Sequence, residues 1–282
     1  MNDRIRIWQN YYDQCAAMDG AVFQSARFDI APFQFDAIIA DIRRKLPLND
    51  SDTLLDVGCS TGQIDRALAP HCGRLIGVDL SEESLRVARE LHRNFPHAEF
   101  RWADASDLPF ADDSIDKVLM YGVSMHGDLD WMRQVIAEFV RVTRDRGRIL
   151  IGDNISPTLW QRYLANKGLR RAIGAYATLN PEGEFLILPR VIAYHLRKIV
   201  AMRWRRWRIP EIRHTLDPVD EPTENSAFET GELLEAVAAT GQTGRILGQN
   251  YRLPYARFRY DLIIDVRKPG SATETTDSHR QP

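Results

Sequence analysis

Short apolar runs alternate with amphipathic stretches along residues 50–153. Residues 53–57 form an apolar, β-rich run that stops at Gly58, and apolar residues then recur at helical spacing over 64–68. Because neighbouring parallel strands need a crossover helix between them, this alternation predicts a doubly wound parallel sheet covered on both faces. The same strand pattern returns at residues 75–78, 98–103, 115–120 and 148–151.

Helix-start and helix-end signals separate these runs. Ser81, followed by two glutamates, predicts a helix start after the second strand. Apolar positions over 135–140 predict a helix after the fourth strand, and we expect Gly147 to close that helix region. The last helix is predicted at 231–239, and two further strands of the same sheet at 245–248 and 260–266.

These patterns divide the chain into five segments. Residues 50–154 are expected to form the core of the sheet, whose carboxyl edge is where doubly wound folds bind their ligands, and residues 229–269 to add its last helix and final two strands. Residues 1–49, with an aromatic cluster and helical spacing, are expected to form a helical lid or flank. Residues 155–228 are too long for a loop, since connections usually take about 4–6 residues, and predict a mainly helical insertion that caps the substrate. The Ser-, Thr- and charge-rich residues 270–282 predict a disordered tail.

Composition and charge narrow the function classes. The 282 residues are 44% hydrophobic and 27% charged, as in an ordinary globular protein. A formal net charge of -2 supplies no positive field for phosphates, which argues against a nucleic-acid partner. Three cysteines without C-x-x-C spacing predict neither a disulfide framework nor a zinc site. With a charged start and no apolar run of about 18 residues, we expect a cytoplasmic protein.

Acidic residues stand where the first three predicted strands end. Asp56 precedes the turn 58–62, whose small residues let the backbone approach a ligand at a helix N-terminus. Asp79 is placed to accept both hydroxyls of a ribose. Asp104, beside Ala105, is placed to accept a hydrogen bond from an adenine amino group. Since ligands of doubly wound folds bind at this carboxyl edge, the three acids predict a nucleoside site.

Four blocks of the sequence resemble the class I S-adenosylmethionine-dependent methyltransferases, especially the small-molecule branch that includes quinone-biosynthesis enzymes. The blocks are LLDVGCSTG at 54–62, LIGVDLS at 75–81, WADA at 102–105, and the stretch from SID at 114–116 to GRI at 147–149. The resemblance implies a Rossmann-like seven-stranded sheet with an antiparallel last strand, and S-adenosyl-L-methionine as cofactor.

The resemblance also implies residue roles. Gly58 and Gly62 would hold the methionine part, Asp79 the ribose, and Asp104 with Ala105 the adenine. The residues expected to bind the cofactor are Asp56, Gly58, Cys59, Ser60, Gly62, Asp79, Leu80, Asp104, Ala105 and Tyr121.

The sequence departs from the family pattern and leaves alternatives open. Ser60 stands where the family usually has a glycine, and residues 145–147 read Asp-Arg-Gly instead of Pro-Gly-Gly. The turn misses the G-x-G-x-x-G spacing of nicotinamide enzymes, but it matches the G-x-S-x-G elbow of α/β-hydrolases, in which Ser60 would be the nucleophile. That elbow normally follows a later strand. A non-catalytic binding module with this fold is the third alternative.

Methyl transfer is an in-line displacement that mainly needs positioning and exclusion of water. His126, after the fourth predicted strand, is the candidate general base, and a packing histidine is the alternative. Tyr11 and Tyr12 either close over the cofactor or belong to the core. Residues 153–154 (Asp-Asn) are similar to the metal-binding pair of catechol-type methyltransferases. However, residues 120–121 (Met-Tyr) replace the further carboxylate of those enzymes, so we expect no metal.

Residues 190–209 predict an amphipathic helix inside the insertion. Its apolar stripe and its cationic side suit either a membrane interface or a lid packed on the core. We therefore expect a small-molecule or lipid- or sugar-linked acceptor, with peripheral contact to the inner membrane surface through 190–209 as one outcome. The stripe contains Leu196, Val200, Trp204 and Trp207, and the cationic side Arg197, Lys198, Arg205 and Arg206.

Overall fold

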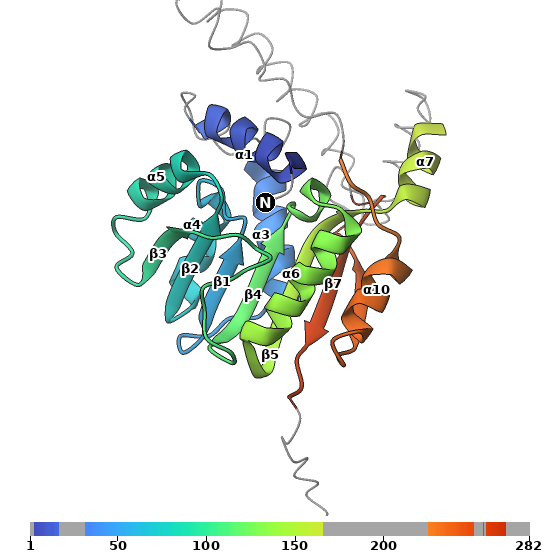
Figure 1. Ribbon diagram of the computed structural model, residues 1–282. Helices are drawn as coiled ribbons and strands as arrows, with labels where there is room; N and C mark the ends of the chain where they lie inside the picture. Colours follow the sequence, from blue (N-terminus) through green and yellow to red (C-terminus); the bar gives the residue numbers. More distant parts are fainter. Residues whose placement is uncertain (1–2, 17–31, 166–224, 251–255, 257, 269–282) are drawn as a thin grey trace, which may run out of the picture.

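A single mixed sheet forms the centre of the protein. The computed structural model describes residues 3–16, 32–165, 225–250, 256 and 258–268. Seven strands follow the order β3-β2-β1-β4-β5-β7-β6, and neighbours are parallel except where β7 pairs with β5 and β6 (Figure 1). The predicted Rossmann-like sheet with an antiparallel last strand is therefore confirmed. The strands are β1 Thr53–Val57, β2 Arg74–Asp79, β3 Ala98–Trp102, β4 Ile115–Tyr121, β5 Thr143–Ile155, β6 Gly244–Gly248 and β7 Arg259–Asp265.

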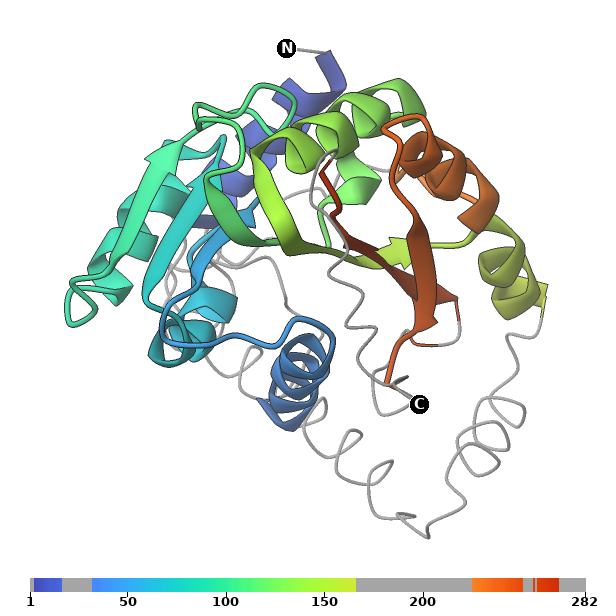
Figure 2. The ribbon, with the colours of Figure 1, turned by 90° about the horizontal axis from the view of Figure 1, so that it is seen from below.

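Helices cover both faces of this sheet (Figure 2). Successive strand side chains alternate between faces, so Leu55 and Ile76 pack with α6 and α10, whereas Leu54 and Leu75 pack with α3, α4 and α5. The first helix, α1, lies across the carboxyl ends of the parallel strands (Figure 1). The helices are α1 Asp3–Ala16, α3 Pro32–Lys45, α4 Gln63–Leu68, α5 Glu82–Leu91, α6 Leu129–Val142, α7 Pro157–Ala165 and α10 Thr230–Ala238, with short 3-10 turns η1 Ala69–His71 and η2 Ser124–His126.

Local signals set most of the element boundaries. Ser81 begins α5 as predicted, because its hydroxyl oxygen accepts the Ser84 N–H at 3.0 Å. The expectation that Gly147 closes the helix before β5 is wrong. Helix α6 ends at Val142, and Thr143 is already extended, with its hydroxyl donating to the Phe139 carbonyl at 2.6 Å. The start of β5 is irregular rather than helical, since its pairing with β4 shifts register there.

Several predictions fall outside the described residues. These are the amphipathic helix at 190–209, most of the insertion at 155–228, and the tail at 270–282. Within the described part of the insertion, α7 begins directly after β5. In the parts of the chain that the structure describes, no helix has the length and apolar character needed to span a membrane.

Candidate functional site

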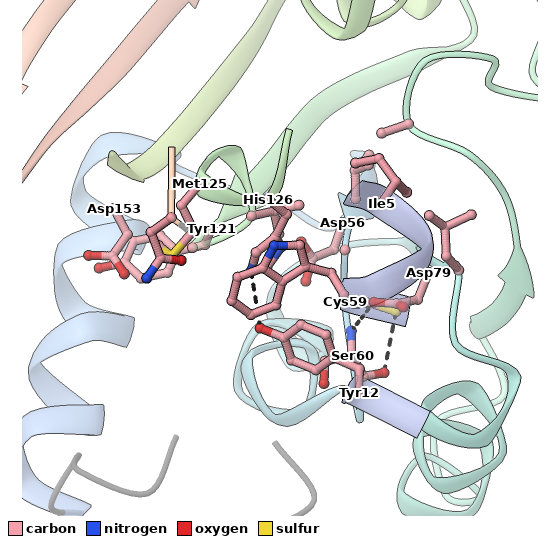
Figure 3. A pocket seen from close by; sticks show the side chains of 18 of the residues that line it. Ile5, Tyr12, Asp56, Cys59, Ser60, Asp79, Tyr121, Met125, His126 and Asp153 are labelled. Atoms are coloured by element: carbon pink, nitrogen blue, oxygen red, sulfur yellow. Dashed lines mark hydrogen bonds between the residues drawn. The ribbon is translucent and has the colours of Figure 1, made fainter. Parts of the chain in front are cut away.

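A cavity of about 670 Å³ opens where β1, β2 and β4 end, beneath α1 (Figure 3). Its volume is in the range of about 300–1,000 Å³ that is typical of small-molecule sites. Helix α1 lines it with Ile5, Trp8, Gln9 and Tyr12. Two further groups come from the ends of the first three strands and from β4, η2, β5, α7 and the start of β7. The first group includes Asp56, Gly58, Cys59, Ser60, Asp79, Leu80, Ala103 and Ala105, and the second Tyr121, Met125, His126, Asp153, Ile155, Trp160, Phe258 and Arg259.

The turn after β1 is wound by three residues in the left-handed backbone region. Gly58, Ser60 and Gly62 have φ angles of 79°, 50° and 72°. A Cβ atom on Gly58 would lie 2.4 Å from a methyl of Val123, so glycine is required there by contact as well as by conformation. Ser60 adopts the same region although it has a side chain, which costs about 1–2 kcal/mol. Close backbone approach is thus built into this turn.

Asp79 fixes the turn to the end of β2. Its Oδ2 accepts the Ser60 N–H at 2.8 Å and its Oδ1 accepts the Ser81 N–H at 2.9 Å. Burial raises the pKa of the Asp79 carboxyl, and these backbone N–H bonds oppose that rise because they stabilise the charged form. Each oxygen keeps a further lone pair that can accept a hydrogen bond from a ligand in the cavity.

A second buried carboxyl lies behind Asp56. Asp65, in the first turn of α4, is 0% exposed, and Asp56, which lines the cavity, is 3% exposed. Burial raises the pKa of Asp65 well above its ordinary value, and the charge of Asp56 raises it further. The pair therefore favours one carboxylate at the cavity and one protonated carboxyl behind it. The sequence analysis missed Asp65, which stands beside the apolar helix positions without any motif of its own.

The two residues expected to hold the adenine lie differently: Ala105 lines the cavity, as does its neighbour Ala103, whereas Asp104 is not among the lining residues. Gly62, expected to hold the methionine part, is not among them either. The Oδ1 atom of Asp104 accepts the backbone N–H of Ser106 at 2.9 Å and the Ser106 hydroxyl at 2.8 Å. Asp104 thus shapes the loop after β3 through its own side chain.

His126 lies beneath α1 at the middle of the cavity (Figure 3). It is 8% exposed, its ring centre lies 4.2 Å from that of Trp8 with the ring planes inclined by 37°, and its Nε2 lies 3.4 Å from the hydroxyl of Tyr12. Tyr12 lines the cavity, whereas Tyr11 packs edge-on against Trp8 and outside the cavity lining. The histidine therefore has a fixed ring plane and a hydroxyl neighbour.

Hydrogen bonds hold α1 against the end of β2, above the lining residues that come from the first strands. Gln9 donates its side-chain N–H to the Leu80 carbonyl at 2.9 Å, and the Ser81 hydroxyl donates to Asp13 at 2.5 Å. Helix α1 also contacts α5 and η2. The helix covers the cavity and limits the access of water to it.

The second group of lining residues forms an apolar wall with one ion pair. Trp160 and Phe258 meet edge-on with ring centres 4.8 Å apart. Asp153 Oδ2 accepts from Arg259 Nη1 at 2.6 Å, and both side chains are 14% exposed. Among the residues that the structure describes, no group of three or more His, Cys, Asp or Glu side chains could hold a metal ion. Arg259 and its neighbours carry no sequence motif, so sequence reasoning missed them.

The geometry does not support Ser60 as a hydrolase nucleophile. A nucleophilic serine needs a base within hydrogen-bond reach. The Ser60 hydroxyl is buried and has no hydrogen-bond partner in the described structure. The hydroxyl next to His126 Nε2 is instead that of Tyr12.

Comparison with known proteins agrees with this arrangement. Residues 55–151 match the family model described as a methyltransferase domain. The methyltransferase GfsG of Streptomyces halstedii is 30% identical over 51% of this chain and 56% of its own length, and a demethylmenaquinone methyltransferase of Halalkalibacterium halodurans is 29% identical over 42% and 50%. The chain thus spans about half the length of these curated relatives.

A solved structure has the same fold. The geranyl diphosphate C-methyltransferase of Streptomyces coelicolor A3(2), in complex with Mg²⁺, geranyl diphosphate and S-adenosyl-L-homocysteine, aligns with a TM-score of 0.55 at 15% identity over 93% of this chain and 96% of that one. The match to the domain family, the sheet order and the resemblance of the strand-end motifs agree with one another. Residues 55–151 therefore match a methyltransferase domain, and the sheet order is the one implied by the resemblance to the class I S-adenosylmethionine-dependent methyltransferases.

Proposed function

We propose that this chain transfers a methyl group from S-adenosyl-L-methionine to a small-molecule acceptor. The observation that carries the proposal is one continuous cavity, in which Asp56, Asp79 and the turn after β1 line one end and an apolar wall lines the other. Between the two ends lies His126. One end of the cavity would therefore hold the cofactor and the other end the acceptor.

The cofactor half of the cavity fits a nucleoside joined to an amino acid. The turn residues Gly58, Cys59 and Ser60 would hold the methionine part, because their backbone allows close approach, and Gly62 would shape the turn from outside the lining. The buried Ser60 hydroxyl, which has no partner in the described structure, supplies a polar group for that part. Asp79 would accept the ribose hydroxyls. The remaining expected contacts are Asp56, Leu80, Ala105 and Tyr121, which line the cavity, whereas Asp104 would act through the loop that it shapes.

His126 would act as the general base for an acceptor hydroxyl or acidic C–H. The sulfonium donor supplies an electrophilic methyl group, so the protein must hold the acceptor atom about 3–3.5 Å from it in line with the C–S bond. As the acceptor atom bonded to the methyl carbon, the C–S bond would break with its electron pair left on sulfur, and the acceptor proton would move to His126, whose ring is held by Trp8 and by the Tyr12 hydroxyl. Helix α1 excludes water during this step.

Two measurements test this proposal. Calorimetric titration with S-adenosylhomocysteine should show binding, and a radiolabelled methyl assay against a panel of phenols, enols and prenylated quinols should show transfer. His126→Ala should lower turnover by roughly 10²- to 10⁴-fold and leave cofactor affinity near that of the parent. His71→Ala, on η1 outside the cavity lining, is the matched control.

The outcomes of these tests separate the alternatives. Failure to bind S-adenosylhomocysteine would overturn the proposal. Binding without transfer to any acceptor would favour the non-catalytic binding module. Turnover of His126→Ala equal to that of the parent would assign His126 to packing alone.

The relatives favour an acceptor with an extended apolar part. One is named for demethylmenaquinone, and the solved structure holds geranyl diphosphate. The apolar wall of Trp160 and Phe258 suits such an acceptor, and so would a lipid- or sugar-linked one.

Residues 190–209, which lie outside the described part of the chain, would bring this acceptor from the inner membrane surface to the cytoplasmic enzyme. Membrane binding through these residues is tested by co-sedimentation with anionic liposomes. A variant with Gln at Arg197, Lys198, Arg205 and Arg206 should co-sediment less than the parent, and parent binding should fall as salt rises. No parent binding at low salt would contradict the membrane proposal and leave the methyltransferase proposal standing.

A further inference from the structure

Asp153 is held at the far end of the cavity in an unusual backbone conformation. Its φ angle is 67°, and the pairing of β5 with β7 shifts register between Ile151 and Asn154. A residue with a side chain in this region is strained, and such strain persists only where the surroundings impose it. The bulge turns the Asp153 side chain into the cavity, beside Tyr121 and Met125 (Figure 3).

A buried network imposes this conformation. The Asp153 N–H donates to Asp261 Oδ1 at 2.9 Å, and Asp261 Oδ2 accepts from Lys45 Nζ at 2.5 Å. Lys45 and Asp261 side chains are each 1% exposed, and Lys45 also donates to Asp41 Oδ2 at 2.6 Å. The bulge is therefore anchored through β7 to helix α3, on the side away from the cavity.

The charge of Arg259 is compensated at this wall. Its Nη1 donates to Asp153 Oδ2 at 2.6 Å and to the Asp153 carbonyl at 3.2 Å. Gln249 donates to the other oxygen, Asp153 Oδ1, at 3.1 Å. The guanidinium and the carboxylate together present hydrogen-bond donors and acceptors with no net charge.

The rest of the described lining offers an anion no compensation. Among the described lining residues, the carboxylate and guanidinium groups besides those of Asp153 and Arg259 belong to Asp56 and Asp79, both acidic, and the base role proposed for His126 requires its neutral form. An anionic acceptor would therefore meet carboxylates and an arginine that is already paired, and like charges placed side by side disfavour binding. The apolar part of the wall, with Trp160 and Phe258, accepts a flat ring.

We propose that the Asp153–Arg259 pair and its apolar neighbours form an acceptor subsite that selects uncharged, ring-bearing hydroxyl compounds over their carboxylate analogues. The proposal rests on the proposed function, because it assigns the acceptor end of the same cavity. An anionic part of a larger acceptor would have to lie beyond this wall. Asp261 and Lys45 are positioning residues, since they act on the cavity only through Asp153.

The test uses two probes that share a ring and differ in charge, 2-naphthol and 2-naphthoate. Each is titrated near neutral pH into the full-length protein saturated with S-adenosylhomocysteine, and Kd is measured by calorimetry. We expect 2-naphthol to bind at least about tenfold more tightly than 2-naphthoate to the parent, which corresponds to about 1.4 kcal/mol.

Variants that change the charge of Asp153 or Arg259 should shift the ratio of the two Kd values in opposite directions. Asp153→Asn leaves the Arg259 charge uncompensated, so the preference for 2-naphthol should shrink by about tenfold or more. Arg259→Gln should enlarge it, because Asp153 then repels the carboxylate. The double variant is neutral again and should return close to the parental ratio. Asp130→Asn is the matched control, since the Asp130 side chain is 83% exposed on α6.

Each outcome is decisive. A parental Kd for 2-naphthoate equal to or lower than that for 2-naphthol, an unchanged ratio in Asp153→Asn, or no binding of either probe would overturn the subsite. The double variant keeps the test valid if one single variant fails to fold, as thermal unfolding would show. S-adenosylhomocysteine binding in the same samples separates the two proposals, because its loss in the parent would contradict the proposed function itself.

Discussion

Replacing Asp79 with alanine tests where the cofactor ribose lies. In the structure each carboxylate oxygen already accepts one backbone N–H, from Ser60 or Ser81. A carboxylate offers about four lone-pair sites, so each oxygen retains one for a ribose hydroxyl. A hydrogen bond to a charged group contributes about 1.5–3 kcal/mol, and the loss of two would cost about 3–6 kcal/mol. Asp79→Ala should therefore raise the Kd of S-adenosylhomocysteine by about 10²- to 10⁴-fold.

Calorimetry measures this loss, and a second ligand separates the ribose bonds from damage to the turn. Asp79→Ala also removes the acceptors of the Ser60 and Ser81 N–H groups, which would weaken binding of any ligand at the turn. An analogue without the two ribose hydroxyls should lose much less affinity than S-adenosylhomocysteine does. Equal losses for the two ligands, or no loss for S-adenosylhomocysteine, would refute the ribose assignment. Asp130→Ala, at an exposed position, should change neither Kd.

Two further substitutions probe the cofactor end of the cavity. Gly58→Ala would place an alanine in the left-handed backbone region, which costs about 1–2 kcal/mol, and its Cβ would lie 2.4 Å from a Val123 methyl. Chemical denaturation should therefore show a large loss of stability. Adding Val123→Ala should recover only part of this loss, because it removes the clash but not the backbone strain. Burial raises the pKa of Asp65, so the folded protein favours its neutral form and loses stability as pH rises through that pKa. The Asp65→Asn variant cannot ionise and does not lose this stability. The gain in Tm of Asp65→Asn over the parent should therefore grow from mildly acidic to alkaline pH, and a gain independent of pH would contradict the neutral form.

The sheet was largely predictable because its strands carry signals that are local in sequence. Residues 53–57 are apolar on both faces of the strand, as a strand covered by helices on each side must be, and Leu54 and Leu55 do pack with opposite helix layers. Ser81 is a helix cap that acts within three residues. The start of β5 was not predictable in this way, because its extended residues before Gly147 depend on register with β4 rather than on their own pattern.

The two ends of the cavity also differ in how far their residues could be predicted from local sequence signals. Asp79 could be predicted as a site residue because it follows an apolar strand at a fixed distance from the turn. The acceptor wall depends on contacts between distant segments: Lys45 reaches Asp261 across 216 positions, and Arg259 reaches Asp153 across 106. Neither pair leaves a periodic trace in the sequence, and the strained bulge at Asp153 exists only because β7 lies beside β5.

The carboxylates of Asp79 and Asp153, at the two ends of the cavity, are stabilised by different kinds of partner, and this difference decides which ligand each can bind. Asp79 is held by two backbone N–H groups, which fix its position without cancelling its charge, so it remains attractive to hydroxyl donors and to a cationic ligand. Asp153 is held by a guanidinium, which cancels its charge at 2.6 Å. Only the Asp79 end of the cavity therefore has a carboxylate whose negative charge is not cancelled by a neighbouring cation. A cationic methyl donor should bind at that end and an uncharged acceptor at the Asp153 end.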